Sequence, residues 1–198
     1  MKKIILASGS AQRKRLLAQI TPSFEVIPAE VDETLPAHLP PRDGAAAVAR
    51  RKAETAAAIA AGRGVQGIVI GADTIVVAGS GKPRIIGKPE DDAHATAILK
   101  RLSGSRHSVV TGLCVLDIAS GRAEVGWDET HIVMYAMTDK QIGEYVASGE
   151  ARGKAGAYGF REDGDPYVKQ VEGSFSNVLG LPIELLREFL KRLDVEIG

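Results

Sequence analysis

The sequence predicts a mixed α/β protein, and three stretches support this prediction. Residues 67–77 form a near-continuous apolar, β-branched run, which is typical of a strand buried on both faces. Residues 43–61 are rich in alanine and carry apolar side chains at helical spacing. Residues 107–117 and 122–137 resemble two long strands with a Ser-Gly turn between them, which indicates a hairpin within a mixed sheet.

Composition is consistent with such a fold and excludes several other classes of protein. The chain has 198 residues, of which 44% are hydrophobic, enough for a core in one large domain or two small lobes. Basic and acidic residues number 25 each, so the net charge gives no case for binding nucleic acid or an anionic membrane. A single cysteine excludes a disulfide framework, and no apolar run approaches transmembrane length. We therefore expect a soluble, cytoplasmic protein with no nucleic-acid or membrane partner.

The first elements are predicted to be a strand, a short turn and a helix that together could bind an anion. The strand is expected over residues 3–7, the Ser-Gly-Ser turn at 8–10, and the helix over 11–20 with Ser10 as its N-cap. Three basic residues crowd the first turns of this helix: Arg13, Lys14 and Arg15. The helix macrodipole disfavours cations there, and a phosphate held by free backbone N–H groups would relieve the conflict. A solvated basic face explains the same residues equally well.

A second strand is expected at residues 24–27, and the loop that follows it is rich in carboxylates. Glu30, Asp32 and Glu33 lie within four positions of one another. This crowding is tolerable in water and more favourable beside a cation, so one of the three could bind a metal. Spacing alone does not choose among them, and an ordinary solvated loop is the alternative.

Asp43 is expected to cap the alanine-rich helix. Val48, Thr55 and Ile59 recur at helical spacing and define its predicted inner face, and Lys52 falls on the same face. A lysine in that position either extends its ammonium group to solvent or meets an anion. From the helix alone, extension to solvent is the favoured interpretation.

Asp73 lies in the middle of the apolar strand over residues 67–77. An ionised carboxylate in such surroundings costs several kcal/mol unless a cation or hydrogen-bond donors hold it, so we expect Asp73 to face a partner. Gly71 and Ala72 would leave room for that partner. The alternative is that Asp73 ends the strand and caps a turn, but the apolar residues 75–77 favour a strand that continues.

A further cation, Lys88, is placed by the segment Gly87-Lys88-Pro89 just before a helix expected over residues 91–102. In the hairpin, His107 and His131 are expected on the strand surfaces. The sequence pattern assigns no function to either histidine.

The last part of the chain is predicted to contain two helices, a glycine-rich segment and a strand. Thr138 and Gln141 form a capping box for a helix that reaches about Ala147. The glycine-rich stretch at 148–164 would permit close approach of the backbone to a ligand, although it suits a surface loop equally. The remaining predicted segments are a strand over 166–171, a loop over 173–182 and an amphipathic helix over 183–193.

With these residues in place, the chain resembles the Maf family of nucleoside triphosphate pyrophosphatases, and the likeness covers nearly the whole length. It rests on seven motifs in order: Leu6-Ala7-Ser8-Gly9-Ser10 with Arg13, Glu33 after Val31-Asp32, Lys52, Gly71-Ala72-Asp73-Thr74, Gly87-Lys88-Pro89, Lys154-Ala155-Gly156-Ala157-Tyr158-Gly159, and the run from Gly173 to Pro182. So many ordered motifs make a chance match very improbable.

The resemblance implies a fold, an assembly and a reaction. The fold would be similar to that of inosine triphosphate pyrophosphatases: one domain over residues 1–198, with two lobes around a central mixed sheet and a cleft between them. A homodimer is also implied. The reaction would be hydrolysis of a nucleoside triphosphate between its α and β phosphates, with magnesium or manganese as the divalent cation, to give the nucleoside monophosphate and pyrophosphate.

Roles for individual residues follow from the same resemblance. Asp73 would orient or deprotonate the attacking water and share the metal with Glu33, and whether Asp73 is the base or mainly a metal ligand stays open. Three cations would neutralise charge on the phosphates: Arg13, Lys52 and Lys88. Substrate contacts are expected from Ser8, Ser10, Gln12, Lys154 and Arg161.

Two positions depart from the family pattern. Gln12 stands where the first motif usually carries an arginine, and Arg161 stands where the branch that hydrolyses dTTP and UTP usually carries glutamine. Arg161 would return the charge lost at Gln12. Because the segment Ala72-Asp73-Thr74 resembles that branch, the expected substrates are dTTP and UTP.

Two other functions compete with this interpretation. A non-catalytic nucleotide-binding regulator of cell division and septum formation would use the same residues to sense a nucleotide, but it would not need both Glu33 and Asp73. A phosphate-binding scaffold that docks a protein or nucleic acid is the third candidate, and the neutral charge gives it little support.

Overall fold

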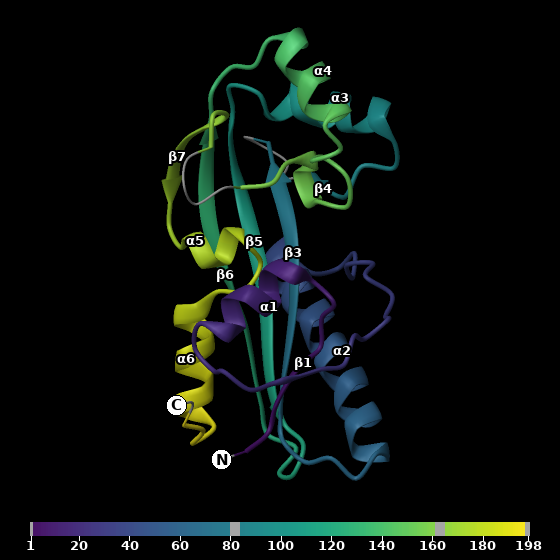
Figure 1. The fold of residues 1–198 in the computed structure, drawn as a ribbon, viewed down its shortest axis with the longest axis vertical. Helices are drawn as coiled ribbons and strands as arrows, with labels where there is room; N and C mark the ends of the chain where they lie inside the picture. The colour runs from purple at the N-terminus through teal and green to yellow at the C-terminus, as the bar shows by residue number, and fades with distance from the viewer. Residues whose placement is uncertain (1, 80–83, 161–164, 197–198) are drawn as a thin grey trace. The chain divides into compact units, whose positions relative to one another are not determined.

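The structure is a computed structural model that describes residues 2–79, 84–160 and 165–196 (Figure 1). The strands are β1 (Ile4–Leu6), β2 (Glu25–Val26), β3 (Ile68–Ala78), β4 (Arg84–Ile86), β5 (Arg106–Asp117), β6 (Ala123–Met134) and β7 (Val168–Glu172). The helices are α1 (Ala11–Ala18), α2 (Pro41–Gly62), α3 (Asp92–Leu102), α4 (Asp139–Ala147), α5 (Phe175–Val178) and α6 (Ile183–Arg192), with a short 3₁₀ turn η1 (Ala155–Ala157).

The strands form one mixed sheet in the order β2-β1-β3-β5-β6-β7, and β4 pairs with β3 off this path. β1 is parallel to both β2 and β3, whereas β4 is antiparallel to β3 and β7 is antiparallel to β6. The predicted mixed α/β class is therefore confirmed. In the part of the chain that the structure describes, no helix has both the length and the apolar character needed to cross a membrane.

The chain divides into two compact units. Unit 1 comprises Met1–Asp73, Thr111–Asp128 and Ser176–Gly198, and unit 2 comprises Thr74–Val110 and Glu129–Phe175. The boundary in β3 falls directly after Asp73.

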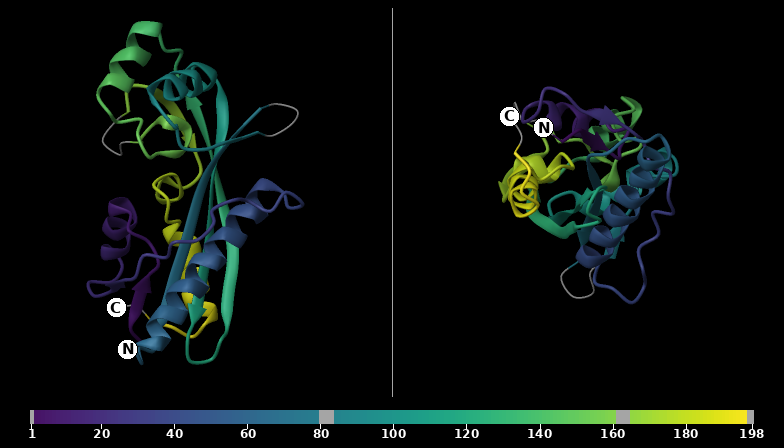
Figure 2. Two further views of the ribbon diagram at one scale, coloured as in Figure 1. Left: turned by 90° about the vertical axis from the view of Figure 1, so that its right-hand side faces the viewer. Right: turned by 90° about the horizontal axis from the view of Figure 1, so that it is seen from below.

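In unit 1, α2 runs along the sheet at very short distance (Figures 1 and 2). A Cβ atom added to Gly71 on β3 would collide with the carbonyl oxygen of Ala49, and one added to Gly112 on β5 would collide with that of Ala45. The room that Gly71 leaves is thus occupied by the backbone of α2. At this separation small side chains are favoured against the sheet, and most of the buried residues of α2 are alanine.

Two details of α2 differ from the sequence prediction. Asp43 does not cap the helix, which begins at Pro41 after the N-cap Pro40, because proline is pre-organised for the first helical turn. The Asp43 carboxylate instead accepts a hydrogen bond from Trp127 Nε1 at 3.1 Å. Ile59 is 36% exposed and therefore does not belong to the inner face, whereas Val48 is fully buried there.

The close packing of α2 predicts a clear response to one added methyl group. Gly71→Ala is expected to lower the free energy of unfolding by about 2 kcal/mol, because the helix must move away from β3. Gly62→Ala at the end of the same helix is the matched control, since a Cβ there meets nothing within 4 Å. Urea unfolding of both variants measures the difference, and equal stabilities would contradict the packing argument.

The helices α1, α3 and α4 begin within one residue of the predicted positions, whereas α1 ends at Ala18, two residues earlier than predicted. Ser10 caps α1, and its hydroxyl accepts a hydrogen bond from the backbone N–H of Arg13. Asp91 caps α3. The capping box of α4 is complete, because Thr138 and Gln141 exchange hydrogen bonds in both directions.

His107 is buried in unit 2, and the expectation that it lies on a strand surface is wrong. Its ring is only 3% exposed, and its Nε2 lies 2.7 Å from the hydroxyl oxygen of Tyr158. Burial lowers the pKa of His107 to about 4. His131 is half-buried and hydrogen-bonds Ser108 through Nδ1, as a residue on the sheet surface would.

Candidate functional site

The buried carboxylate of Asp73 has a cationic partner, as the sequence requires, and that partner is Lys52. The Lys52 ammonium group donates a hydrogen bond to Asp73 Oδ1 at 2.7 Å, and the two side chains are 7% and 9% exposed. The interpretation that Lys52 extends to solvent is therefore wrong. The closeness of α2 to β3 leaves its ammonium group among carboxylates, where pairing offsets the cost of desolvation.

A second carboxylate converges on the same ammonium group. Glu33 Oε1 lies 2.7 Å from Lys52 Nζ, while the Glu33 side chain remains 48% exposed. Among the three carboxylates of this loop, Glu33 is the one whose pairing with Lys52 the structure establishes. Asp32 instead accepts a hydrogen bond from the backbone N–H of Thr34 at 2.9 Å.

Arg51 holds the carboxylate loop against α2. Its guanidinium group donates hydrogen bonds of 2.8 Å to the carbonyl oxygens of Asp32 and Thr34, the two neighbours of Glu33 in the chain. The loop is therefore anchored on both sides of Glu33. Sequence reasoning missed this role, because Arg51 is off the apolar face of the helix and no spacing rule relates it to the loop.

Arg13 approaches the carboxylates from α1 and is held in position by backbone and side-chain acceptors. Its Nε donates to the carbonyl oxygen of Gly180 at 2.8 Å, and its terminal NH1 group donates to Ser8 Oγ at 3.2 Å. Burial lowers the pKa of Arg13, while the negative charges of Asp73 and Glu33 oppose that shift. Arginine retains its proton in such surroundings, so Arg13 supplies a permanent positive charge.

The carbonyl that orients Arg13 depends on a glycine. Gly180 has a φ of 98°, a conformation that side chains other than hydrogen rarely adopt. It belongs to the run from Gly173 to Pro182 that carries the resemblance, so the motif itself was the signal that could have identified it. In the structure, the carbonyl oxygen of Gly180 serves to position Arg13.

The other predicted site residues are distributed as follows. Ser8 is buried and Ser10 is half-buried in the turn before α1, whereas Gln12 is exposed on the helix. Lys88 and Lys154 belong to unit 2, and Lys154 pairs with Glu150 at 2.8 Å. Arg161 lies outside the described residues.

Within unit 2, the loops that carry Lys88 and Lys154 are joined. The backbone N–H of Gly156 donates a hydrogen bond to the carbonyl oxygen of Gly87 at 3.2 Å. Gly156 has a φ of 76°, so glycine is favoured at this turn as well. The two lysines thus belong to segments that a backbone hydrogen bond joins.

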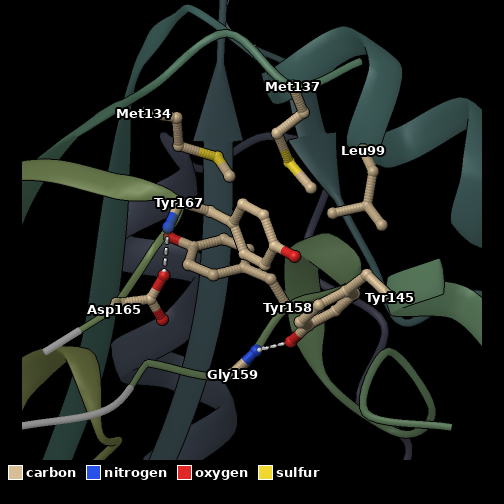
Figure 3. Close-up of a pocket in the computed structure, with 8 residues that line it drawn as sticks. All are labelled: Leu99, Met134, Met137, Tyr145, Tyr158, Gly159, Asp165 and Tyr167. Carbon is tan, nitrogen blue, oxygen red and sulfur yellow. Dashed lines mark hydrogen bonds between the residues drawn. The ribbon is translucent and has the colours of Figure 1, made fainter. Parts of the chain in front are cut away.

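A small pocket in unit 2 anchors the segment that follows Lys154 (Figure 3). It is lined by Leu99, Met134, Met137, Tyr145, Tyr158, Gly159, Asp165 and Tyr167. The Tyr145 hydroxyl accepts a hydrogen bond from the backbone N–H of Gly159 at 2.9 Å, and Asp165 accepts one from Tyr167 at 2.8 Å. The rings of Tyr145 and Tyr167 meet edge to face at 5.5 Å between centroids. The described residues of this lining include one carboxylate and no cation, a set that is suited to packing and not to phosphate.

The carboxylates of unit 1 fit a divalent cation that a substrate helps to hold. Among the described residues, no group of three or more His, Cys, Asp or Glu side chains gathers where it could bind a metal. Glu33 and Asp73 provide two hard oxygen donors that lie close together, since each places an oxygen 2.7 Å from Lys52 Nζ. Magnesium is commonly held by one or two carboxylates together with substrate phosphates and water, and this donor set meets that requirement.

The family model for Maf-like proteins matches residues 3–193, and the chain therefore belongs to the Maf family. The resemblance found in the motifs is thus confirmed. The chain is 39% identical to the dTTP/UTP pyrophosphatase of Pelotomaculum thermopropionicum, over 100% of both chains. It is 36% identical to the dTTP/UTP pyrophosphatase of Caldicellulosiruptor saccharolyticus, over 100% of this chain and 98% of that one.

Solved structures give a more distant match. The Ham1 protein of Staphylococcus aureus aligns with a TM-score of 0.49 and 19% sequence identity, over 97% of this chain and 100% of that chain.

Proposed function

We propose that this protein is a nucleoside triphosphate pyrophosphatase that hydrolyses dTTP and UTP to the nucleoside monophosphate and pyrophosphate. The observation that carries the proposal is the convergence of Glu33 and Asp73 on the buried Lys52, while the positive charge of Arg13 interacts electrostatically with both carboxylates. Full-length relatives that are named dTTP/UTP pyrophosphatases support the substrate class.

Each residue of the site has a proposed task. Asp73 orients the attacking water and accepts its proton, while Lys52 and Arg13 stabilise negative charge on the phosphate oxygens. Ser8, Ser10 and the backbone N–H groups at the start of α1 bind further phosphate oxygens. A magnesium or manganese ion, when bound through Glu33 and Asp73, supplies additional positive charge.

The residues of unit 2 have a proposed share in binding the substrate. Lys88 and Lys154 contribute positive charge from joined loops, and Arg161 compensates for Gln12. The water oxygen forms a new bond to the α-phosphorus. The bond between the α-phosphorus and the oxygen that bridges the α and β phosphates breaks, and pyrophosphate leaves with that oxygen.

A panel of nucleotides tests the proposal. The purified protein is incubated with magnesium or manganese and with dTTP, UTP, CTP, GTP or 7-methyl-GTP, and pyrophosphate and monophosphate are measured together. We expect equimolar release of both products, fastest from dTTP and UTP. Release of inorganic phosphate, or of neither product from any nucleotide, would contradict the assignment.

The non-catalytic regulator of cell division is the less favoured function. It would explain binding of a nucleotide but gives no reason for two carboxylates to share one buried lysine. The homodimer and the cytoplasmic location stay predictions, and sedimentation of the purified chain and fractionation of cells would test them.

A further inference from the structure

Lys52 engages the two carboxylates that the proposed function assigns to a metal. Its ammonium group lies 2.7 Å from Glu33 Oε1 and 2.7 Å from Asp73 Oδ1. Each bond is charge-assisted, and such bonds are among the strongest hydrogen bonds in proteins. A divalent cation that approaches Glu33 and Asp73 must therefore compete with a cation that is already bound to both.

The charges at this point are balanced before any ligand arrives. Glu33 and Asp73 each contribute one negative charge, and Lys52 and Arg13 each contribute one positive charge. The cluster as a whole thus offers a free divalent cation little net attraction.

Displacing Lys52 is also unfavourable, because its side chain is 7% exposed. An ammonium group that loses both carboxylate partners while still buried becomes an uncompensated charge, which is strongly destabilising.

A nucleoside triphosphate changes this balance. It carries roughly four negative charges, and its oxygens offer new acceptors to Lys52 and Arg13 while they also complete the coordination of a metal. If Lys52 were to donate to phosphate oxygens instead, Glu33 and Asp73 would become available to hold the metal.

We infer that Lys52 keeps free divalent metal out of this site, and that the metal enters only together with the nucleotide. The inference rests on the proposed function, since it takes a metal–triphosphate complex as the ligand. The inference goes beyond that function, because it states that the protein recognises the metal–triphosphate complex and binds no metal in the absence of the nucleotide.

Manganese binding measured without any nucleotide tests the inference directly. The electron paramagnetic resonance signal of free Mn²⁺ is followed as full-length protein is added. We expect negligible binding to the wild type at millimolar Mn²⁺, and binding roughly tenfold tighter or more in Lys52→Met, which removes the charge but keeps the length of the side chain. Lys52→Arg is the matched control, because it retains the charge and is expected to bind no better than the wild type.

Several outcomes separate this inference from the proposed function. Tight binding of Mn²⁺ alone to the wild type would overturn the inference even if a variant fails to fold. Equal affinities in Lys52→Met and the wild type, with both folded by circular dichroism, would overturn it as well. A wild type that binds Mn²⁺ only when a non-hydrolysable α,β-imido triphosphate is added supports it. Failure to hydrolyse any nucleotide would instead count against the proposed function.

Discussion

Asp73→Asn is expected to lower kcat on dTTP by about 1,000-fold while the fold is retained. Asparagine matches aspartate in shape, and its carbonyl oxygen can still accept the hydrogen bond from Lys52, which also keeps its pair with Glu33. The amide cannot take a proton from water, and a positioned base contributes about 100- to 10,000-fold to the rate. Initial rates of pyrophosphate release, with circular dichroism to confirm folding, measure the effect.

A neighbouring carboxylate provides the control for this substitution. Glu30 is exposed in the same loop as Glu33, and Glu30→Gln removes one negative charge from the same surface. We expect its kcat to remain within about twofold of the wild type, since exposed charges a few residues away are screened by solvent. If Asp73→Asn retained activity similar to that of Glu30→Gln, the role proposed for Asp73 would be wrong.

Acidification from pH 7 to pH 4 is expected to remove about 3 kcal/mol of stability through His107 alone. Its pKa is lowered from 6.5 to about 4 by burial, so the unfolded chain takes up the proton first as the pH falls. The stabilisation is therefore complete above pH 6.5 and is lost progressively between pH 6.5 and about 4. A charged imidazole would also be unable to accept a hydrogen bond from the Tyr158 hydroxyl.

Two histidine variants isolate this contribution. His107→Gln, which has no proton to gain, is expected to show a flatter dependence of unfolding free energy on pH between 7 and 4. His131→Gln makes the same exchange at a half-buried histidine on the adjacent strand and serves as the matched control. Urea titrations at several pH values measure the slopes, and parallel curves for the wild type and His107→Gln would refute the assignment.

Local signals in the sequence were sufficient to predict most of the helices and strands. Ser10, Asp91 and the Thr138 capping box determine where three helices begin, because an N-cap satisfies orphan N–H groups through contacts within a few residues. The helix α2 begins at Pro41, earlier than predicted, because proline is pre-organised for the first helical turn and no side chain caps the helix. The short strand β4 and the short helix α5 were not predicted, as neither has enough residues to show a period.

The candidate site was predicted in its residue types but not in its pairings. Solvation chemistry alone required a partner for Asp73, because a carboxylate inside an apolar strand must be held by donors or a cation. Which partner it has depends on Gly71, whose missing side chain lets α2 approach until Lys52 reaches the strand. Helical periodicity placed Lys52 on a face but could not show how close that face comes to the sheet.

Short-range patterns and the chemistry of single residues were enough to predict most of the elements, the family and the need for charge neutralisation around Asp73. The pairing of Glu33 with Lys52, the anchoring of the loop by Arg51 and the burial of His107 emerge only from the packed structure. Each of these depends on residues far apart in the chain. The physical reason is that packing distance and desolvation are set by all the elements that meet at one point, and no single segment encodes them.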